Sequence, residues 1–298
     1  MERRIKPRNY GFLEKFTWYV PGVADLFILL GFFLLGALVG NLVALPFIAL
    51  LGTESGMEYG SLVAYPLMFI PPMLYASVKS RNNSFTRSGV KLDSSHFSPL
   101  GGALCALFVV LGTLALSFCT EPLIALLPEM PPALEEMLKG LTQGNLLINF
   151  IMVSIFAPFF EEWLCRGMVL RGLLGTKMKP VWAIVISALF FAFIHLNPWQ
   201  AVPAFLLGCL FGYVYYKTGS LKLTMLMHFT NNTFALVISN ISAFEEAESW
   251  MDVLPGTAYW IVFFALILLL VLVIRAFTRI PEEYPEGNLD PVKPLFEE

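Results

Sequence analysis

The sequence predicts an all-α polytopic membrane protein with about eight transmembrane helices in one bundle. Hydrophobic residues make up 57% of the 298 residues, charged residues make up 14%, and the mean hydropathy is +0.71. This composition is too apolar for an ordinary soluble domain. The apolar runs approach or exceed about 20 residues, the length that a helix needs to cross a bilayer. No extended run alternates apolar and polar residues as a membrane barrel strand does.

The predicted spans follow the apolar runs, with edges set to within a few residues. They cover 22–51, 59–78, 98–118, 146–165, 181–196, 199–216, 223–243 and 257–275. The fourth can continue as a helix to Arg171. The fifth is short for a full crossing, and only the "LNPW" stretch at 196–199 separates it from the sixth.

Basic residues predict the orientation of these spans. They gather before the first span, after every second span and after the last, and of the 19 basic residues only Lys139 falls in another loop. Because cytoplasmic loops are enriched in Lys and Arg, we expect both termini in the cytoplasm and the chain in the inner (cytoplasmic) membrane. The first apolar run is long and begins late, so we expect an uncleaved span rather than a secretory signal.

The chain then divides into six segments. We expect a basic cytoplasmic segment at 1–21, three spans in 22–118, an external loop at 119–145, a four-helix core at 146–243, the last span at 257–277, and a disordered cytoplasmic tail at 278–298. In the external loop, the spacing of Leu134, Met137, Leu138 and Leu141 predicts a short amphipathic helix.

Other features of the composition exclude simple alternatives. The four cysteines form no CxxC pair, so we expect reduced packing residues without disulfides. The net charge of −3 argues against a nucleic-acid partner. Two GxxxG pairs, Gly36/Gly40 and Gly208/Gly212, are typical of close helix packing.

The stretch "FAPFFEEWLCRG" at 156–167 places Glu161, Glu162 and Arg166 where the flanking sequence predicts lipid. A charged side chain at mid-membrane costs roughly 2.5–3.5 kcal/mol, so such residues face a partner or a water-filled cavity. Glu162 and Arg166 are four residues apart in the order that favours a helical ion pair. Glu161 lies about 100° round the helix and lacks that partner.

Two later spans add further polar groups. His195 ends the fifth span, and His228 lies in the seventh with Asn232 four residues later on the same helical face. A carboxylate and an imidazole can activate a water molecule for attack on a carbonyl, while His and Asn donors stabilise the oxyanion. No GxSxG motif appears. Cys165 is a weak nucleophile candidate, because Arg166, the nearest cation, is expected to pair with Glu162.

Together, these residues resemble a known family. Glu161-Glu162-x-x-x-Arg166, Phe191-x-x-x-His195 and His228-x-x-x-Asn232 resemble the three-motif signature of the CAAX prenyl protease and bacteriocin-processing (CPBP, Abi) family of intramembrane proteases, which includes Rce1-type endopeptidases. The resemblance covers about 145–240, and the first three spans lie outside it.

The resemblance implies an eight-helix endopeptidase that acts on a membrane-associated peptide or protein. Glu161 and His195 would activate water, His228 and Asn232 would form the oxyanion site, and Glu162 and Arg166 would hold the site's shape. We expect no cofactor. The alternative is a catalytic zinc held by Glu161, His195 and His228.

Two other function classes remain open. Intramembrane Glu and His can relay protons, as in a proton-coupled transporter, although the sequence has no internal repeat. A non-catalytic immunity or scaffold membrane protein would keep the fold. For a protease, His195 is too far along its span to meet Glu161 in upright helices, so we expect a tilted or irregular fifth span and a cavity that opens to the cytoplasm.

Overall fold

The computed structural model describes residues 13–281 apart from 87–88, 95, 242–248 and 255. Residues 1–12 of the predicted N-terminal segment and 282–298 of the predicted disordered tail lie outside this part. Every regular element among the described residues is a helix, and none is a strand, which confirms the all-α class.

Each predicted span coincides with a helix. The long helices are α1 (Val23–Leu51), α2 (Thr53–Asn83), α3 (Gly102–Cys119), α9 (Pro180–Phe193), α10 (Pro198–Thr218), α11 (Leu221–Ile238) and α13 (Thr257–Thr278). The fourth span is continuous from Leu146 to Leu174 and consists of α6 (Leu146–Asn149), η2 (Phe150–Phe156), α7 (Ala157–Glu162), η3 (Trp163–Leu170) and α8 (Arg171–Leu174). Short helices are η1 (Glu14–Phe16), α4 (Glu121–Ile124), α5 (Pro132–Gln143) and α12 (Trp250–Val253).

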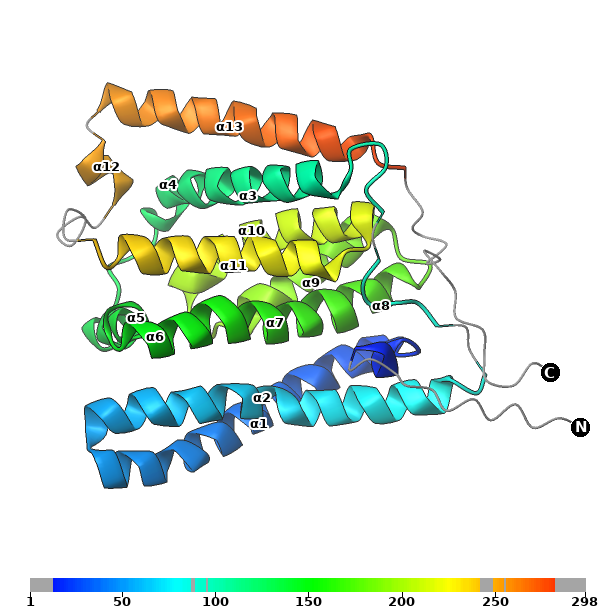
Figure 1. Ribbon diagram of the computed structural model, residues 1–298, viewed down its shortest axis with the longest axis horizontal. Coiled ribbons are helices and arrows are strands. Elements are labelled where there is room, and N and C mark those ends of the chain that lie inside the picture. Colours follow the sequence, from blue (N-terminus) through cyan, green and yellow to red (C-terminus); the bar gives the residue numbers. More distant parts are fainter. Residues whose placement is uncertain (1–12, 87–88, 95, 242–248, 255, 282–298) are drawn as a thin grey trace, which may run out of the picture.

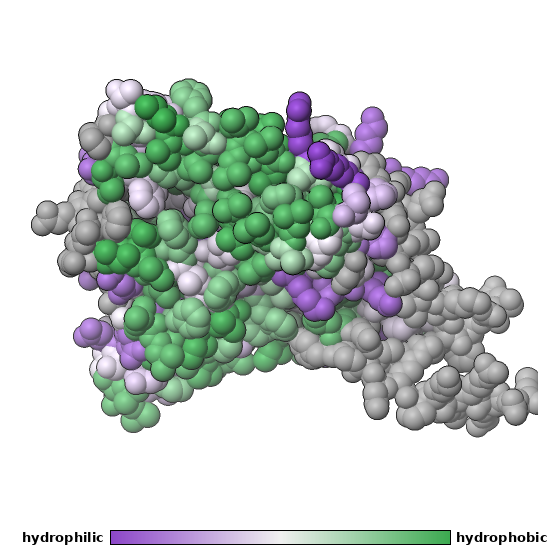
Figure 2. Space-filling view, turned by 45° about the horizontal axis from the view of Figure 1, so that its top comes forward, coloured by the Kyte–Doolittle hydropathy of each residue, from purple (hydrophilic) through white to green (hydrophobic). Residues whose placement is uncertain are grey.

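Among the described residues, five helices are long and apolar enough to cross a membrane: α1, α2, the α3–α4 stretch, the α6–α8 stretch and α13. The predicted count of eight is therefore not confirmed. α9 has 14 residues, about 21 Å of helix, and is short for a hydrocarbon core of about 30 Å. Hydrophobic residues cover most of the face shown in Figure 2, and hydrophilic residues gather towards its ends. These features support an integral membrane bundle.

Figure 1 shows the α1–α2 hairpin along one side of the bundle. α9 packs against α10, α3 packs against α13 and α11, and α11 also contacts α7 and η2. α1 begins and α13 ends at the same end of the molecule (Figure 1), while α5 and α12 lie at the opposite end. This arrangement agrees with termini on one side of the membrane, and the cytoplasmic assignment of that side stays a prediction.

The α1–α2 hairpin is tighter than the sequence predicted, because α2 begins at Thr53 rather than near residue 59. Gly52, with φ 82°, joins the two helices without a longer loop. A Cβ at Gly56 would overlap the backbone of Ile48, so this glycine allows close packing instead of marking a loop. The sequence does not distinguish these two uses of glycine.

The predicted Gly36/Gly40 pair lies in the same helix contact. A Cβ at Gly40 would be 2.8 Å from the carbonyl oxygen of Ala64, and one at Gly36 would overlap the carbonyl of Met68. These glycines therefore bring α1 against the backbone of α2, as small residues do between membrane helices.

Gly36→Ala is expected to destabilise the protein by about 3 kcal/mol, near the upper end for overpacking, because the overlapping atoms of Met68 are backbone and cannot rotate away. Gly31→Ala on the same helix is the matched control, since nothing lies within 4 Å of a Cβ there. Thermal unfolding of the purified protein in detergent would measure both. Equal melting temperatures for the two variants would contradict the packing argument.

Candidate active site

Two π-helical stretches, η2 and η3, flank the short helix α7 that carries both glutamates. At the end of η2, the Ala157 N–H bonds to the carbonyl of Met152, five residues earlier. The next residue, Pro158, has no N–H to offer to Val153. The side-chain amide of Asn232 takes this place and donates to the Val153 carbonyl at 2.9 Å. The π-helical stretch thus leaves the Val153 carbonyl free to accept a hydrogen bond from α11, which joins α11 to the helix that carries the glutamates.

The predicted ion pair is present. Arg166 Nη1 lies 2.8 Å from Glu162 Oε1, and both side chains are fully buried. Arg166 Nη2 also donates to the carbonyl of Gly208 at 3.1 Å, and the guanidinium stands over the rings of Phe191 (4.5 Å) and Phe211 (5.2 Å). Arg166 therefore links the fourth span to α9 and α10 through charge, hydrogen bonding and cation–π contact.

Glu162 has a second partner that the sequence did not predict. The Nδ1 atom of His228 lies 3.1 Å from the same Oε1 that Arg166 binds, and His228 is only 4% exposed. The Glu162 oxygen that accepts from Arg166 is an acceptor, so Nδ1 of His228 is the donor in this contact. Glu162 thus orients the imidazole as well as neutralising the arginine.

His195 lies just beyond α9, which ends at Phe193. The chain turns there because Leu196 adopts a left-handed conformation with φ 57°. Asn197 then caps α10 by accepting the Gln200 N–H, and its amide donates to the His195 carbonyl. The fifth span is thus an α-helix that ends before His195, which lies in the turn between α9 and α10, and the expected tilt or irregularity of the span stays a prediction.

The ring of His195 is fixed by its own backbone. Its Nδ1 lies 2.8 Å from the Phe191 carbonyl. Because a carbonyl can only accept, Nδ1 carries the proton and Nε2 keeps a lone pair. The motif spacing Phe191-x-x-x-His195 thus sets the tautomer of the histidine.

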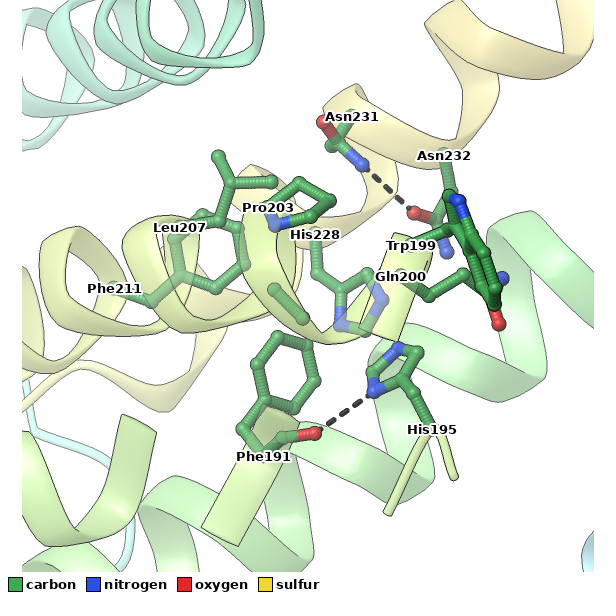
Figure 3. Close-up of a pocket in the computed structure, with 11 residues that line it drawn as sticks. Phe191, His195, Trp199, Gln200, Pro203, Leu207, Phe211, His228, Asn231 and Asn232 are labelled. Atoms are coloured by element: carbon green, nitrogen blue, oxygen red, sulfur yellow. Dashed lines mark hydrogen bonds between the residues drawn. The ribbon is translucent and has the colours of Figure 1, made fainter. Parts of the chain in front are cut away.

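Three of the four predicted catalytic residues, His195, His228 and Asn232, line one cavity of about 170 Å³. Figure 3 shows the two imidazoles next to each other, close to the ring of Phe191. The Phe191 ring meets both edge to face, at 5.1 Å from His195 and 5.4 Å from His228. The remaining lining residues are Trp199, Gln200, Pro203, Ala204, Leu207, Phe211 and Asn231, together with Phe191.

Of these lining residues, the sequence predicted neither the polar Trp199, Gln200 and Asn231 nor the apolar Pro203, Ala204, Leu207 and Phe211. Asn231 donates to the side-chain oxygen of Asn232 at 3.1 Å. The "NPWQ" and "TNN" stretches place the polar three beside predicted residues, and this proximity was the only signal in the sequence.

Glu161 is not among the residues that line this cavity. Its Oε1 accepts a hydrogen bond from the hydroxyl of Tyr65 on α2. Its Oε2 is buried and has no hydrogen-bond partner in the described part of the chain. The next residue, Glu162, contacts His228, so Glu161 lies about 100° round α7 from the residue that touches the cavity's histidine.

The cavity lies nearer to the other end of the bundle than the sequence analysis expected. Trp199 and Gln200 occupy the first turn of α10, and the Trp199 indole donates to the carbonyl of Pro128 at 2.9 Å. Pro128 belongs to the loop predicted to be external. The cavity therefore lies beside the loop predicted to be external, because the chain reverses at His195 close to this loop, and the expected cytoplasmic opening stays a prediction.

The zinc alternative does not fit the geometry. Within the described residues, no group of three or more His, Cys, Asp or Glu side chains could hold a metal ion. Glu161 also does not line the cavity that His195 and His228 share, so these three side chains are not grouped around one position.

Cys165 is fully buried in the hydrophobic core. A thiol without solvent exposure and without access to the cavity cannot meet a substrate, so Cys165 packs rather than reacts. Like Cys105, Cys119 and Cys209, it is a free thiol.

Comparison with known proteins gives one match. Residues 143–234 match the family described as type II CAAX prenyl endopeptidase Rce1-like. No curated protein and no solved structure matches the chain. The matched range includes Glu161 and every residue that lines the cavity, whereas Tyr65 and the first three long helices lie outside it. The family points to a protease of the CAAX endopeptidase type, with a membrane-associated protein substrate. Over residues 143–234, this integral membrane protein is therefore similar to the Rce1-like family of type II CAAX prenyl endopeptidases.

Proposed function

We propose that the chain hydrolyses a peptide bond of a membrane-associated protein or peptide with a water molecule activated by Glu161 and His195, with His228 and Asn232 as the oxyanion site and without a metal cofactor. The observation that supports this most directly is the cavity that His195, His228 and Asn232 share inside the matched region. A cavity lined by two histidines and two asparagines, one of whose histidines contacts the Glu162 carboxylate, is a suitable place for hydrolysis in a bilayer.

In the first step, the water loses a proton to the base formed by Glu161 and His195, and its oxygen attacks the substrate's carbonyl carbon. The Nε2 lone pair of His195 and the unpartnered Oε2 of Glu161 are the acceptors that this step needs. The electron pair of the carbonyl bond moves to its oxygen. The oxyanion then collapses, the C–N bond breaks, and the base returns its proton to the leaving amine.

The oxyanion would receive N–H groups from His228 and Asn232. Since Nδ1 of His228 donates to Glu162, its Nε2 donates to the oxyanion only when both ring nitrogens carry a proton. The side-chain amide of Asn232 donates one N–H to the Val153 carbonyl, and its second N–H can donate to the substrate. Glu162 and Arg166 hold this arrangement in place.

His228→Ala is expected to lower peptide hydrolysis by about 100- to 1,000-fold, because it removes an oxyanion donor. The purified protein in proteoliposomes would be tested with an internally quenched peptide that carries a farnesylated cysteine followed by three residues. New N-termini in solubilised membrane proteins would be mapped in parallel by mass spectrometry.

His96→Ala is the matched control, since His96 is the one histidine of the sequence outside the predicted site, and cleavage should stay within about 2-fold of the wild type. A wild-type protein that produces no new N-termini would contradict the proposal. Proton-coupled uptake lost in His228→Ala without any cleavage product would favour a transporter, and neither activity would favour a scaffold or immunity protein.

A further inference from the structure

We infer that Tyr65, on the second long helix, positions the Glu161 carboxylate for catalysis, so that the N-terminal α1–α2 hairpin completes the active site. This inference rests on the proposed function. It assigns a role to a part of the chain that lies outside the matched range 143–234.

The first observation is that the two carboxylate oxygens of Glu161 differ in their hydrogen bonding. Oε1 accepts the Tyr65 hydroxyl, across 96 positions of sequence. Oε2 is buried and has no hydrogen-bond partner among the described residues. One oxygen is therefore held in place, while the other has no hydrogen-bond donor in the described part of the chain and can accept one during the reaction. A base fixed in this way loses little orientational freedom when it reacts.

The second observation is that aromatic packing holds both partners in register. The ring of Tyr65 lies 5.7 Å from that of Phe69, one turn further along α2. Phe69 stacks on Phe160 at 5.1 Å, and Phe160 directly precedes Glu161. The same helices thus meet twice, once through rings and once through the hydrogen bond.

The third observation is that α1 braces the helix on which Tyr65 stands. Gly40 faces Ala64, and Gly36 faces Met68, so two close approaches of the hairpin flank Tyr65 on α2. Phe33 of α1 also meets Phe69 edge to face, with ring centroids 5.4 Å apart. A helix held at these points cannot easily rotate the Tyr65 hydroxyl away from Glu161.

Together, the three observations indicate that the α1–α2 hairpin fixes the position of the Glu161 carboxylate through Tyr65. Without the Tyr65 hydroxyl, Glu161 would keep its place on α7. It would lose the hydrogen bond to Oε1 that fixes the rotamer of its side chain. Substrate binding, which depends on the cavity lining, would change little. The expected defect is therefore in turnover rather than in substrate affinity.

Tyr65→Phe is the test, because it removes only the hydroxyl and keeps the ring against Phe69. With the quenched farnesylated peptide as the probe, kcat should fall about 10- to 100-fold, while KM should stay within about 3-fold. Thermal unfolding would verify that the variant is folded. A variant that raises KM at unchanged kcat, or that matches the wild type in both, would overturn the inference.

Tyr75→Phe is the matched control, since Tyr75 lies on the same helix and also donates to a carboxylate, that of Asp25. Its kcat should stay within about 2-fold of the wild type, because Asp25 is not part of the site. Glu161→Gln separates the two hypotheses. If Glu161→Gln is inactive while Tyr65→Phe is fully active, only the role of Tyr65 is wrong; if Glu161→Gln is active, the proposed function fails and the inference fails with it.

Discussion

Glu161→Gln is expected to reduce turnover by about 1,000-fold or more, which is within the range for loss of a general base. Glutamine keeps the length and shape of the side chain, and its Oε1 can still accept the hydroxyl of Tyr65. It cannot take a proton from water. The loss should therefore appear in the cleavage rate of the reconstituted protein and not in its melting temperature.

Glu135→Gln on α5 is the matched control for this substitution, since Glu135 pairs with Lys139 at an exposed position outside the cavity. Its activity should equal that of the wild type. A Glu161→Gln variant that keeps more than about a tenth of wild-type turnover would contradict the role of Glu161 as base and with it the proposed function.

Arg166→Met is expected to destabilise the fold by about 3–5 kcal/mol and to abolish cleavage. The substitution leaves the carboxylate of Glu162 fully buried without its cation, and the Gly208 carbonyl loses a donor. Arg166→Lys should recover only part of this loss, because an ammonium cannot reproduce the two directed contacts and the face-on packing against Phe191. Denaturant-induced unfolding in detergent would measure the stability of each variant.

The double variant Glu162→Met/Arg166→Met separates stability from activity. Removing both charges together should restore most of the stability that Arg166→Met loses, since a buried pair can be replaced by apolar residues of similar volume at little cost. Cleavage should stay absent because His228 loses the carboxylate that orients it. Additive losses in the double variant would contradict this interpretation.

The amino-acid sequence by itself determined the membrane class, the positions of the helices and the pairs within one helix. Apolar runs report burial in lipid directly, so each predicted span coincides with a helix. The Glu162–Arg166 pair was predictable because residues four apart meet on any helix. Likewise, the "LNPW" stretch marked the break between α9 and α10 through its local backbone preferences.

Only the tertiary structure decided which groups meet between helices. The contacts of Glu161 with Tyr65, of Glu162 with His228 and of Asn232 with Val153 join positions between 66 and 96 residues apart. The place of the cavity near the loop of Pro128 was likewise not foreseen. Helical periodicity specifies which residues share a face of one helix, but the rotation and depth of that face against its neighbours depend on packing, such as the close approach at Gly36 and Gly40.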